Sequence, residues 1–364
     1  MDADKPEGPL RKGWTTGACA TAATAAAYQA LLTGAFPDPV TVALPRGGST
    51  TLALARAVIG DGSATAGVIK DAGDDPDVTH GAEGVATVAT GPSGSGVTFH
   101  AGEGIGTVTL PGLPLPVGEP AINPAPREMI RRAIQAVADQ FDAAGDVSVT
   151  IAIPGGEALA EKTLNGRLGI KGGLSVLGTT GVVVPFSCAA WIHSIHRGID
   201  VARALGLAHV AAATGKTSEE AVKNHYRLAE AALLDMGDFV GGTLKYLRTH
   251  PLPLLTIAGG FAKLVKLAQG HLFLHSSKSQ VDMDRLADLL ASIGAPTEMT
   301  EEARGANTAA QVLALAQSRD LPLANAVAAR ARKVALAAVS ASTRIEVIVF
   351  DRQGRLVGCA GAEG

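Results

Sequence analysis

The chain has 364 residues and a formal net charge of −3, and it is 47% hydrophobic, 18% charged and only 4% aromatic. This balance argues against a general nucleic-acid binder, which needs a basic face. Cys19, Cys188 and Cys359 lie far apart, so they predict neither a disulfide framework nor a thiolate zinc site. The polar N-terminus lacks a signal core and the longest apolar run, residues 181–192, is too short for a membrane span. We therefore expect a cytoplasmic protein with no membrane partner.

The N-terminal part predicts a disordered lead-in over residues 1–10, followed by an Ala-rich helix that ends near Leu32. Thr15 or Thr16 can cap this helix, and Gly17 would let a ligand or another backbone approach its N-terminus. The alternative is an ordinary capped helix that packs through small side chains.

Residues 40–110 are expected to be mostly strands. The predicted strands cover residues 40–44, 50–58, 65–69, 84–90, 97–100 and 105–110, and the first two form a hairpin. Residues 102–106 resemble part of a dinucleotide-binding glycine loop, but a strand follows them where that loop requires a helix. We therefore do not expect an NAD-dependent oxidoreductase.

An acidic loop follows the strand that ends at Ile69. Its charged residues are Lys70, Asp71, Asp74, Asp75, Asp77 and His80. Gly73 and Pro76 prevent regular structure, so the carboxylates lie on an irregular loop at a strand end. The loop either takes part in chemistry or is a solvated turn.

A helix over residues 127–141 begins after Pro126, which suits a first turn. Its arginines form either a carboxylate clamp or a solvated face. A strand over residues 147–153 and a glycine-dense stretch, residues 171–181, come next. Backbone N–H groups in that stretch could hold an anion or the polar end of a cofactor, or the glycines could serve turns that need positive φ.

From Cys188 onward helices and strands alternate. Helices are predicted over residues 189–205, 243–248, 261–269, 282–293, 300–318 and 323–341, with strands over 209–213 and 254–258, short elements at 239–240 and 272–275, and a last hairpin of 345–350 and 355–359. Thr217 and Glu220 predict a capping box for one further helix. His193 and His196 have no third ligand at zinc spacing, so packing is favoured for them.

These elements predict a mixed α/β (α+β) fold. A β-rich N-terminal unit with flanking helices would occupy residues 11–145. A βα-alternating unit with a mostly parallel sheet and a helical C-terminal part would occupy residues 146–364, with ligands at the carboxyl ends of its strands. The Gly- and Ala-rich helix faces are compatible with a homodimer.

Several blocks together resemble the cobalt-precorrin-5B C1-methyltransferase (CbiD) family of cobamide biosynthesis. The matching blocks are residues 13–17, 68–81, 111–113 with 123–124, 163–170, 172–181, and 263–268 with 275–276. Residues 259–263 depart from the family's Gly-His-x-Gly-Lys turn, and residues 277–282 depart from its Ala-Asp-x-Arg run.

The resemblance implies transfer of a methyl group from S-adenosylmethionine to C-1 of cobalt-precorrin-5B, which gives cobalt-precorrin-6A. Such an in-line displacement requires alignment and exclusion of water. The nucleophile is the substrate's own carbon framework, so we expect neither a nucleophilic side chain nor a protein-bound metal. A carboxylate or His could remove a proton, and the catalytic candidates are Asp71, Asp74, Asp75 and His80.

The remaining candidates bind the two ligands. The cofactor candidates are Thr15, Thr16, Gly17, Gly172, Gly173, Thr179 and Thr180. The substrate carries many carboxylate arms, which call for cations and other donors, and its candidates are Arg11, Lys70, Arg127, Arg167, Lys171, Lys263, His275 and Ser276. The alternatives are a non-catalytic tetrapyrrole-binding protein and a metal-dependent hydrolase that uses the acidic loop.

Overall fold

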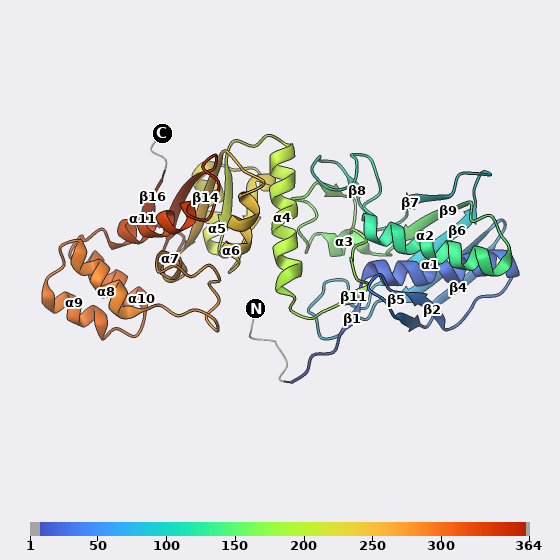
Figure 1. Cartoon of the computed structure of the whole chain (residues 1–364), viewed down its shortest axis with the longest axis horizontal. Coiled ribbons are helices and arrows are strands. Elements are labelled where there is room, and N and C mark those ends of the chain that lie inside the picture. Colours follow the sequence, from blue (N-terminus) through green and yellow to red (C-terminus); the bar gives the residue numbers. More distant parts are fainter. Residues whose placement is uncertain (1–7, 362–364) are drawn as a thin grey trace. The chain divides into compact units, whose positions relative to one another are not determined.

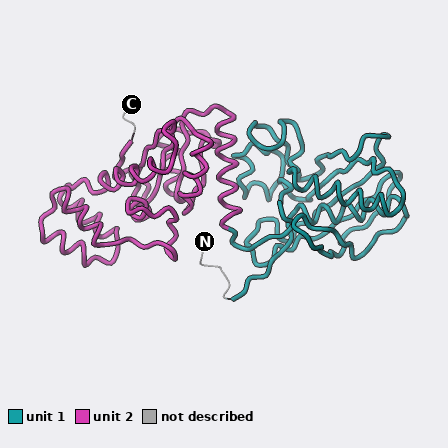
Figure 2. The backbone as a smooth tube through the Cα atoms, in the orientation of Figure 1, with its two compact units in different colours: residues 1–187 teal, residues 188–364 magenta. Residues whose placement is uncertain are grey.

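The computed structural model describes residues 8–361, which form two compact units divided between Ser187 and Cys188 (Figures 1 and 2). Residues 1–7 of the expected lead-in lie outside the described residues. The sequence placed the division at residues 145/146 instead. That boundary is displaced because strand β9 (Val147–Ala152) pairs with β6 and β7 of the first unit.

A five-stranded sheet forms the centre of the first unit. Its order is β4 (Arg56–Gly60), β5 (Ser63–Ile69), β6 (Glu83–Thr90), β9 and β7 (Val97–Ala101), and only β7 and β9 run parallel. Helix α1 (Thr16–Thr33) packs on β5 and β6, and α2 (Pro124–Phe141) packs on α1 (Figure 1). Because α1 is enclosed by the sheet and by α2, most of its residues are buried, which explains its Ala-rich sequence.

Short elements complete this unit. They are the hairpin of β2 (Val40–Ala43) and β3 (Ser49–Leu52), the pair of β1 (Gly13–Trp14) and β11 (Val182–Val183), the pair of β8 (Thr107–Val108) and β10 (Ile170–Lys171), and helix α3 (Gly156–Ala160). The predicted strand over residues 50–58 is two strands in two different sheets, β3 and β4. The strand expected after residues 102–106 is confirmed as β8.

The second unit contains the expected mostly parallel sheet. Its order is β13 (Leu233–Asp235), β12 (Val210–Ala213), β14 (Leu254–Gly260), β15 (Arg344–Phe350) and β16 (Leu356–Ala360). The first four strands are parallel, and β16 pairs antiparallel with β15, which confirms the predicted hairpin.

Helices cover both faces of this sheet. Helix α5 (Lys216–Tyr226) packs on one face, over a core that includes Ala211, Ala258 and Ile348. The other helices are α4 (Cys188–Ala204), α6 (Val240–Leu247), α7 (Phe261–Ala268), α8 (Met283–Ser292), α9 (Thr297–Arg304), α10 (Ala309–Gln317) and α11 (Leu323–Leu336). Side chains of α4, α6, α7 and α11 share a second core with the opposite face of the sheet.

Several sequence predictions for this unit were wrong in detail. Strand β13 was missed, and the short element expected at 239–240 is the start of α6. The helix predicted over residues 300–318 is two helices, because Thr308 begins α10 with a capping box. The capping box expected at Thr217 is absent from the described structure, where α5 begins at Lys216 and Gly215, two residues before Thr217, is its N-cap.

Candidate functional site

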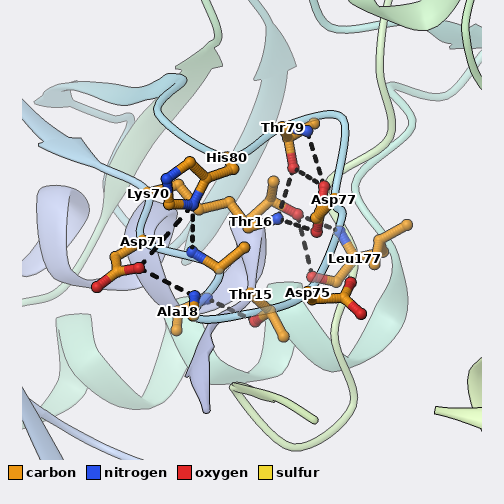
Figure 3. A network of polar contacts seen from close by, with 12 residues as sticks. Thr15, Thr16, Ala18, Lys70, Asp71, Asp75, Asp77, Thr79, His80 and Leu177 are labelled. Carbon is orange, nitrogen blue, oxygen red and sulfur yellow. Dashed lines mark hydrogen bonds and ion pairs between the residues drawn. The ribbon is translucent and has the colours of Figure 1, made fainter. Parts of the chain in front are cut away.

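The acidic loop joins two antiparallel neighbours, β5 and β6, and is closed at its base by backbone hydrogen bonds. The N–H of Lys70 donates to the carbonyl of Ala82 (2.9 Å), and the N–H of Gly81 donates to the carbonyl of Lys70 (2.8 Å). The loop is therefore fixed by the sheet at both ends. Its side chains form a polar network (Figure 3).

Lys70, Asp77 and Thr79 brace the loop from inside. Lys70 is only 3% exposed, and its Nζ donates to the carboxylate of Asp77 and to the hydroxyl of Thr79. The N–H of Thr79 also donates to Asp77 Oδ1 (2.7 Å). Burial acts to raise the pKa of Asp77, but the Lys70 charge and these hydrogen bonds outweigh it and lower that pKa. The geometry gives Lys70 an internal partner, so it is poorly placed for the substrate arms expected from the sequence.

Arg11 and Asp71 form an ion pair on the outside of the loop. The two terminal guanidinium nitrogens, Nη1 and Nη2, donate to the Asp71 carboxylate, Nη2 across 2.9 Å, and the N–H of Gly73 donates to Asp71 Oδ1 (2.9 Å). The hydrogen bonds from Arg11 and Gly73 lower the pKa of Asp71 to about 2. A carboxylate held so firmly in its ionised form is a weak base at neutral pH, so Asp71 is suited to positioning Arg11.

His80 lies beside this ion pair, with its side chain 54% exposed. Its Nδ1 accepts a hydrogen bond from the N–H of Ala72 (3.1 Å) and lies 3.9 Å from Asp71 Oδ1. Because Nδ1 accepts, the proton of the neutral ring lies on Nε2. An exposed imidazole with one nitrogen fixed by the backbone can exchange a proton with a ligand. Of the four predicted catalytic residues, His80 has the geometry that fits that role best.

Asp74 and Asp75 fasten other segments to the loop. Asp74 Oδ2 accepts from the N–H of Arg11 (2.6 Å), and the N–H of Asp74 donates back to the carbonyl of Arg11 (3.0 Å). Asp75 Oδ1 accepts from the N–H of Phe186 (2.8 Å). Both carboxylates therefore serve backbone donors, which favours a positioning role for each.

The start of α1 forms hydrogen bonds with the glycine-dense stretch. Thr15 caps the helix by accepting from the N–H of Ala18 (3.1 Å), as predicted. Thr16 Oγ1 donates to the carbonyl of Leu177 (3.1 Å) and accepts from the N–H of the same residue (3.0 Å), and the N–H of Gly17 donates to that carbonyl as well (3.0 Å). These groups have partners within the chain, so the second alternative for Gly17, approach of another backbone, fits the geometry.

The glycines of residues 171–181 serve turns and close approaches. A Cβ at Gly173 would lie 2.3 Å from the carbonyl of Gly104, and one at Gly178 would lie 2.3 Å from Thr15 Oγ1. Gly172 has open space around it but a φ of +80°, which favours glycine. Thr180 Oγ1 donates to the carbonyl of Val182 (3.0 Å), and Thr179 is exposed. Of the four predicted cofactor positions in this stretch, Gly173 and Thr180 contact other parts of the chain, whereas Gly172 has open space around it and Thr179 is exposed.

The predicted cations of the first unit differ in accessibility. Arg127 is mostly buried and donates to the carbonyl of Ile122 and to Glu119 Oε2 (2.8 Å each), so it braces a loop. Arg167 is half-buried, whereas Lys171 and Arg11 are exposed.

The other predicted substrate residues lie in the second unit. Lys263 Nζ donates to the carbonyl of Thr214 (2.6 Å) and lies 3.0 Å from Asp238 Oδ1. His275 Nδ1 and the Ser277 hydroxyl are 2.8 Å apart, and Ser276 is exposed. Lys263 therefore contacts Thr214 and Asp238, which follow strands β12 and β13 of the parallel sheet. Asp238 was not predicted because β13 was not predicted. The only sequence sign of that short strand is the apolar pair Leu233 and Leu234.

Two broader searches cover the described residues alone. Within residues 8–361, no group of three or more His, Cys, Asp or Glu side chains is arranged to hold a metal ion. Over the same range, no helix combines the length and the apolar character needed to cross a bilayer.

Comparison with known proteins gives matches over both units. Residues 3–185 match the CbiD family, and residues 273–361 match the CbiD C-terminal domain. The cobalt-precorrin-5B C(1)-methyltransferase of a Bradyrhizobium species is 59% identical over 363 residues, 99% of this chain and 96% of that protein. The protein of the same name from Brucella anthropi is 58% identical over 349 residues, 96% of this chain and 95% of that protein.

One solved structure also matches. The crystal structure of a cobalamin biosynthesis protein, CbiD, from Archaeoglobus fulgidus is 27% identical, with a TM-score of 0.40, over 72% of this chain and 80% of that chain.

Proposed function

The chain belongs to the CbiD family, and we propose on that premise that it methylates C-1 of cobalt-precorrin-5B to give cobalt-precorrin-6A. The observation that carries this function is the identity of 58–59% to C(1)-methyltransferases, which extends over 96–99% of the chain and therefore over both units. The chain is a C-methyltransferase of corrin ring synthesis.

The methyl donor is S-adenosylmethionine. The new C–C bond forms as the C–S bond of the sulfonium breaks, and S-adenosylhomocysteine leaves with the electron pair of that bond. The protein must align the two ligands and exclude water, and needs no nucleophile of its own.

His80 is the acceptor for the proton that leaves the macrocycle. Its Nδ1 is fixed by the N–H of Ala72, which leaves Nε2 to exchange the proton. Asp71 contributes by holding Arg11 across the outside of the loop. Asp74 and Asp75 position the loop through the backbone N–H groups of Arg11 and Phe186.

The carboxylate arms of the corrinoid bind to exposed cations. Among the predicted cations of the first unit, Arg11 and Lys171 are exposed, so a carboxylate arm of the corrinoid can reach them from solvent. Arg11 suits this task because a guanidinium has five N–H donors, so those that do not bind Asp71 remain for an arm.

The test is a single-turnover assay of the purified full chain with the corrinoid and S-adenosylmethionine. The expected result is a corrinoid heavier by one methyl group and an equivalent amount of S-adenosylhomocysteine. A mixture with S-adenosylhomocysteine replacing the donor is the control and should leave the corrinoid mass unchanged. Tight corrinoid binding without methyl transfer would overturn the proposal in favour of a tetrapyrrole carrier.

A further inference from the structure

The parallel sheet of the second unit has a switch point between β12 and β14. The chain leaves β12 through α5 to reach β13 on one side, and returns through α6 to β14 on the other side. Helix α5 packs on one face and α6 on the other. Connections that diverge in this way leave a crevice at the carboxyl ends of the strands, where α/β sheets bind ligands.

The carboxyl ends of the three strands are level with one another. Ala213 of β12 is in register with Asp235 of β13 on one side and with Ala258 of β14 on the other. Thr214, Gly215, Asp238, Gly260 and Lys263 follow or end these strands, and we call these five residues the strand-end site.

Two glycines of the strand-end site stand in open space. A Cβ at Gly215 or at Gly260 would meet no other atom within 4 Å. Their φ values are 168° and −70°, which other residues adopt readily. Gly259 differs, because its Cβ would lie 2.8 Å from Thr214 Oγ1. Packing within the described chain accounts for Gly259 and not for Gly215 and Gly260, so the latter two leave room for something from outside.

Gly215 and Gly260 are also the N-caps of α5 and α7. In the described structure neither helix has a side-chain cap at its N-terminus. The first N–H groups of a helix and its dipole attract a negatively charged group. Lys263 adds a positive charge from the first turn of α7, with its side chain 38% exposed. A ligand carboxylate is therefore favoured between the two helix ends.

Asp238 supplies an acceptor at the same place. Its side chain is 20% exposed, and its buried Oδ1 lies 3.0 Å from Lys263 Nζ. That contact is close enough for an ion pair but is not aligned as a hydrogen bond, and no other described group donates to this oxygen. An acid after the second strand of a β-α-β unit is the position from which nucleotide-binding folds hold a ribose.

We propose that the strand-end site binds the methyl donor, with Asp238 accepting from the ribose hydroxyls and the N-termini of α5 and α7 binding the amino-acid carboxylate. This assignment rests on the proposed function, because it takes S-adenosylmethionine as the donor. The acidic corrinoid arms fit less well, since Asp238 would repel them.

The test is calorimetric titration of the full chain with S-adenosylhomocysteine, which binds without turnover. Gly260→Val fills the open space and Asp238→Asn removes the charge of the acceptor. Each should raise the Kd at least tenfold with the melting temperature unchanged. Matched controls are Gly166→Val, at another glycine with open space and no positive φ, and Asp284→Asn, at an exposed acid of the same unit; both should keep the Kd of the unaltered chain.

The outcomes separate the two proposals. If the unaltered chain binds S-adenosylhomocysteine and both site variants bind it equally well, the strand-end site is wrong and the proposed function stands. If the unaltered chain binds neither form of the donor, the donor assignment itself fails. A loss of corrinoid affinity without loss of nucleoside affinity would also overturn the strand-end site.

Discussion

Asp75 holds Phe186 by its backbone: Oδ1 of Asp75 accepts from the Phe186 N–H across 2.8 Å, and Phe186 adopts a φ of +54°. A bulky residue rarely adopts this left-handed conformation, which costs about 1–3 kcal/mol unless neighbouring groups enforce it. Phe186 is the second-to-last residue of the first unit. The acidic loop therefore sets the backbone direction just before the second unit begins.

We expect Asp75→Ala to lower the free energy of unfolding of the first unit by about 1–2 kcal/mol, because it removes a hydrogen bond to a constrained backbone N–H. Adding Phe186→Gly should recover part of the loss, because glycine adopts positive φ without strain. Urea unfolding of the two variants measures both effects, with Asp61→Ala, at an exposed turn, as the control. If Asp75 is instead a base, Asp75→Ala will abolish turnover at unchanged stability.

His80→Gln should slow methyl transfer by about 100-fold or more at saturating ligands, which is the usual contribution of a general base. Its melting temperature should change little, because the side chain is more than half exposed. His100→Gln, at an exposed histidine of β7, is the matched control. Equal single-turnover rates in the two variants would remove His80 from the mechanism.

Lys70→Met should destabilise the first unit by about 3 kcal/mol, because it leaves the Asp77 carboxylate without its buried partner. The double variant Lys70→Met with Asp77→Asn should be more stable than Lys70→Met alone, since the uncompensated charge is gone and the Thr79 hydrogen bonds can remain. Chemical denaturation of the three proteins gives the comparison. A double variant no better than Lys70→Met would mean that the ion pair is not the source of the loss.

Acid should destabilise the first unit through Asp71 and Asp77, whose pKa values are both lowered by folding. A carboxyl with a depressed folded-state pKa contributes its stability above the unfolded value of about 3.9 and loses it as pH falls through the folded value. For Asp71 the folded pKa is about 2, so the loss occurs between that pH and the unfolded value.

Arg11→Gln should flatten this dependence, because the hydrogen bond from Arg11 is the largest cause of the Asp71 shift. Unfolding midpoints followed by circular dichroism from neutral to acid pH measure the slope. Arg46→Gln, at an exposed arginine of the β2–β3 loop, should keep the slope of the unaltered chain. An identical slope in Arg11→Gln would show that this ion pair does not contribute.

Local signals in the sequence predicted much of the fold. The Ala-rich run and its Thr cap gave α1, and the alternation of helices and strands gave the parallel sheet. Elements defined by distant partners were not predictable in this way. β9 belongs to the first unit only because it pairs with β6 and β7, and the three-residue β13 carries too little pattern of its own.

The candidate site shows the same limit. The acidic loop was visible as a concentration of charge, but the burial of Lys70 was not, because a lysine in a polar loop is normally exposed. The sequence left open whether Gly17 faces a ligand or a backbone. The answer depends on Leu177, which lies 160 positions further along the chain.

The tight packing of helix α1 also has a consequence for substitutions within it. Ala22 and Ala26 are fully buried in this helix, which packs on the sheet and on α2, and neither has a long side chain that could shift to absorb a change. A larger residue at Ala26 would displace the whole helix, because a helix moves largely as a rigid body. The displacement would reach its first turn, where Thr16 and Gly17 form hydrogen bonds with Leu177. A substitution far from the acidic loop can thus displace the backbone contact between Gly17 and Leu177.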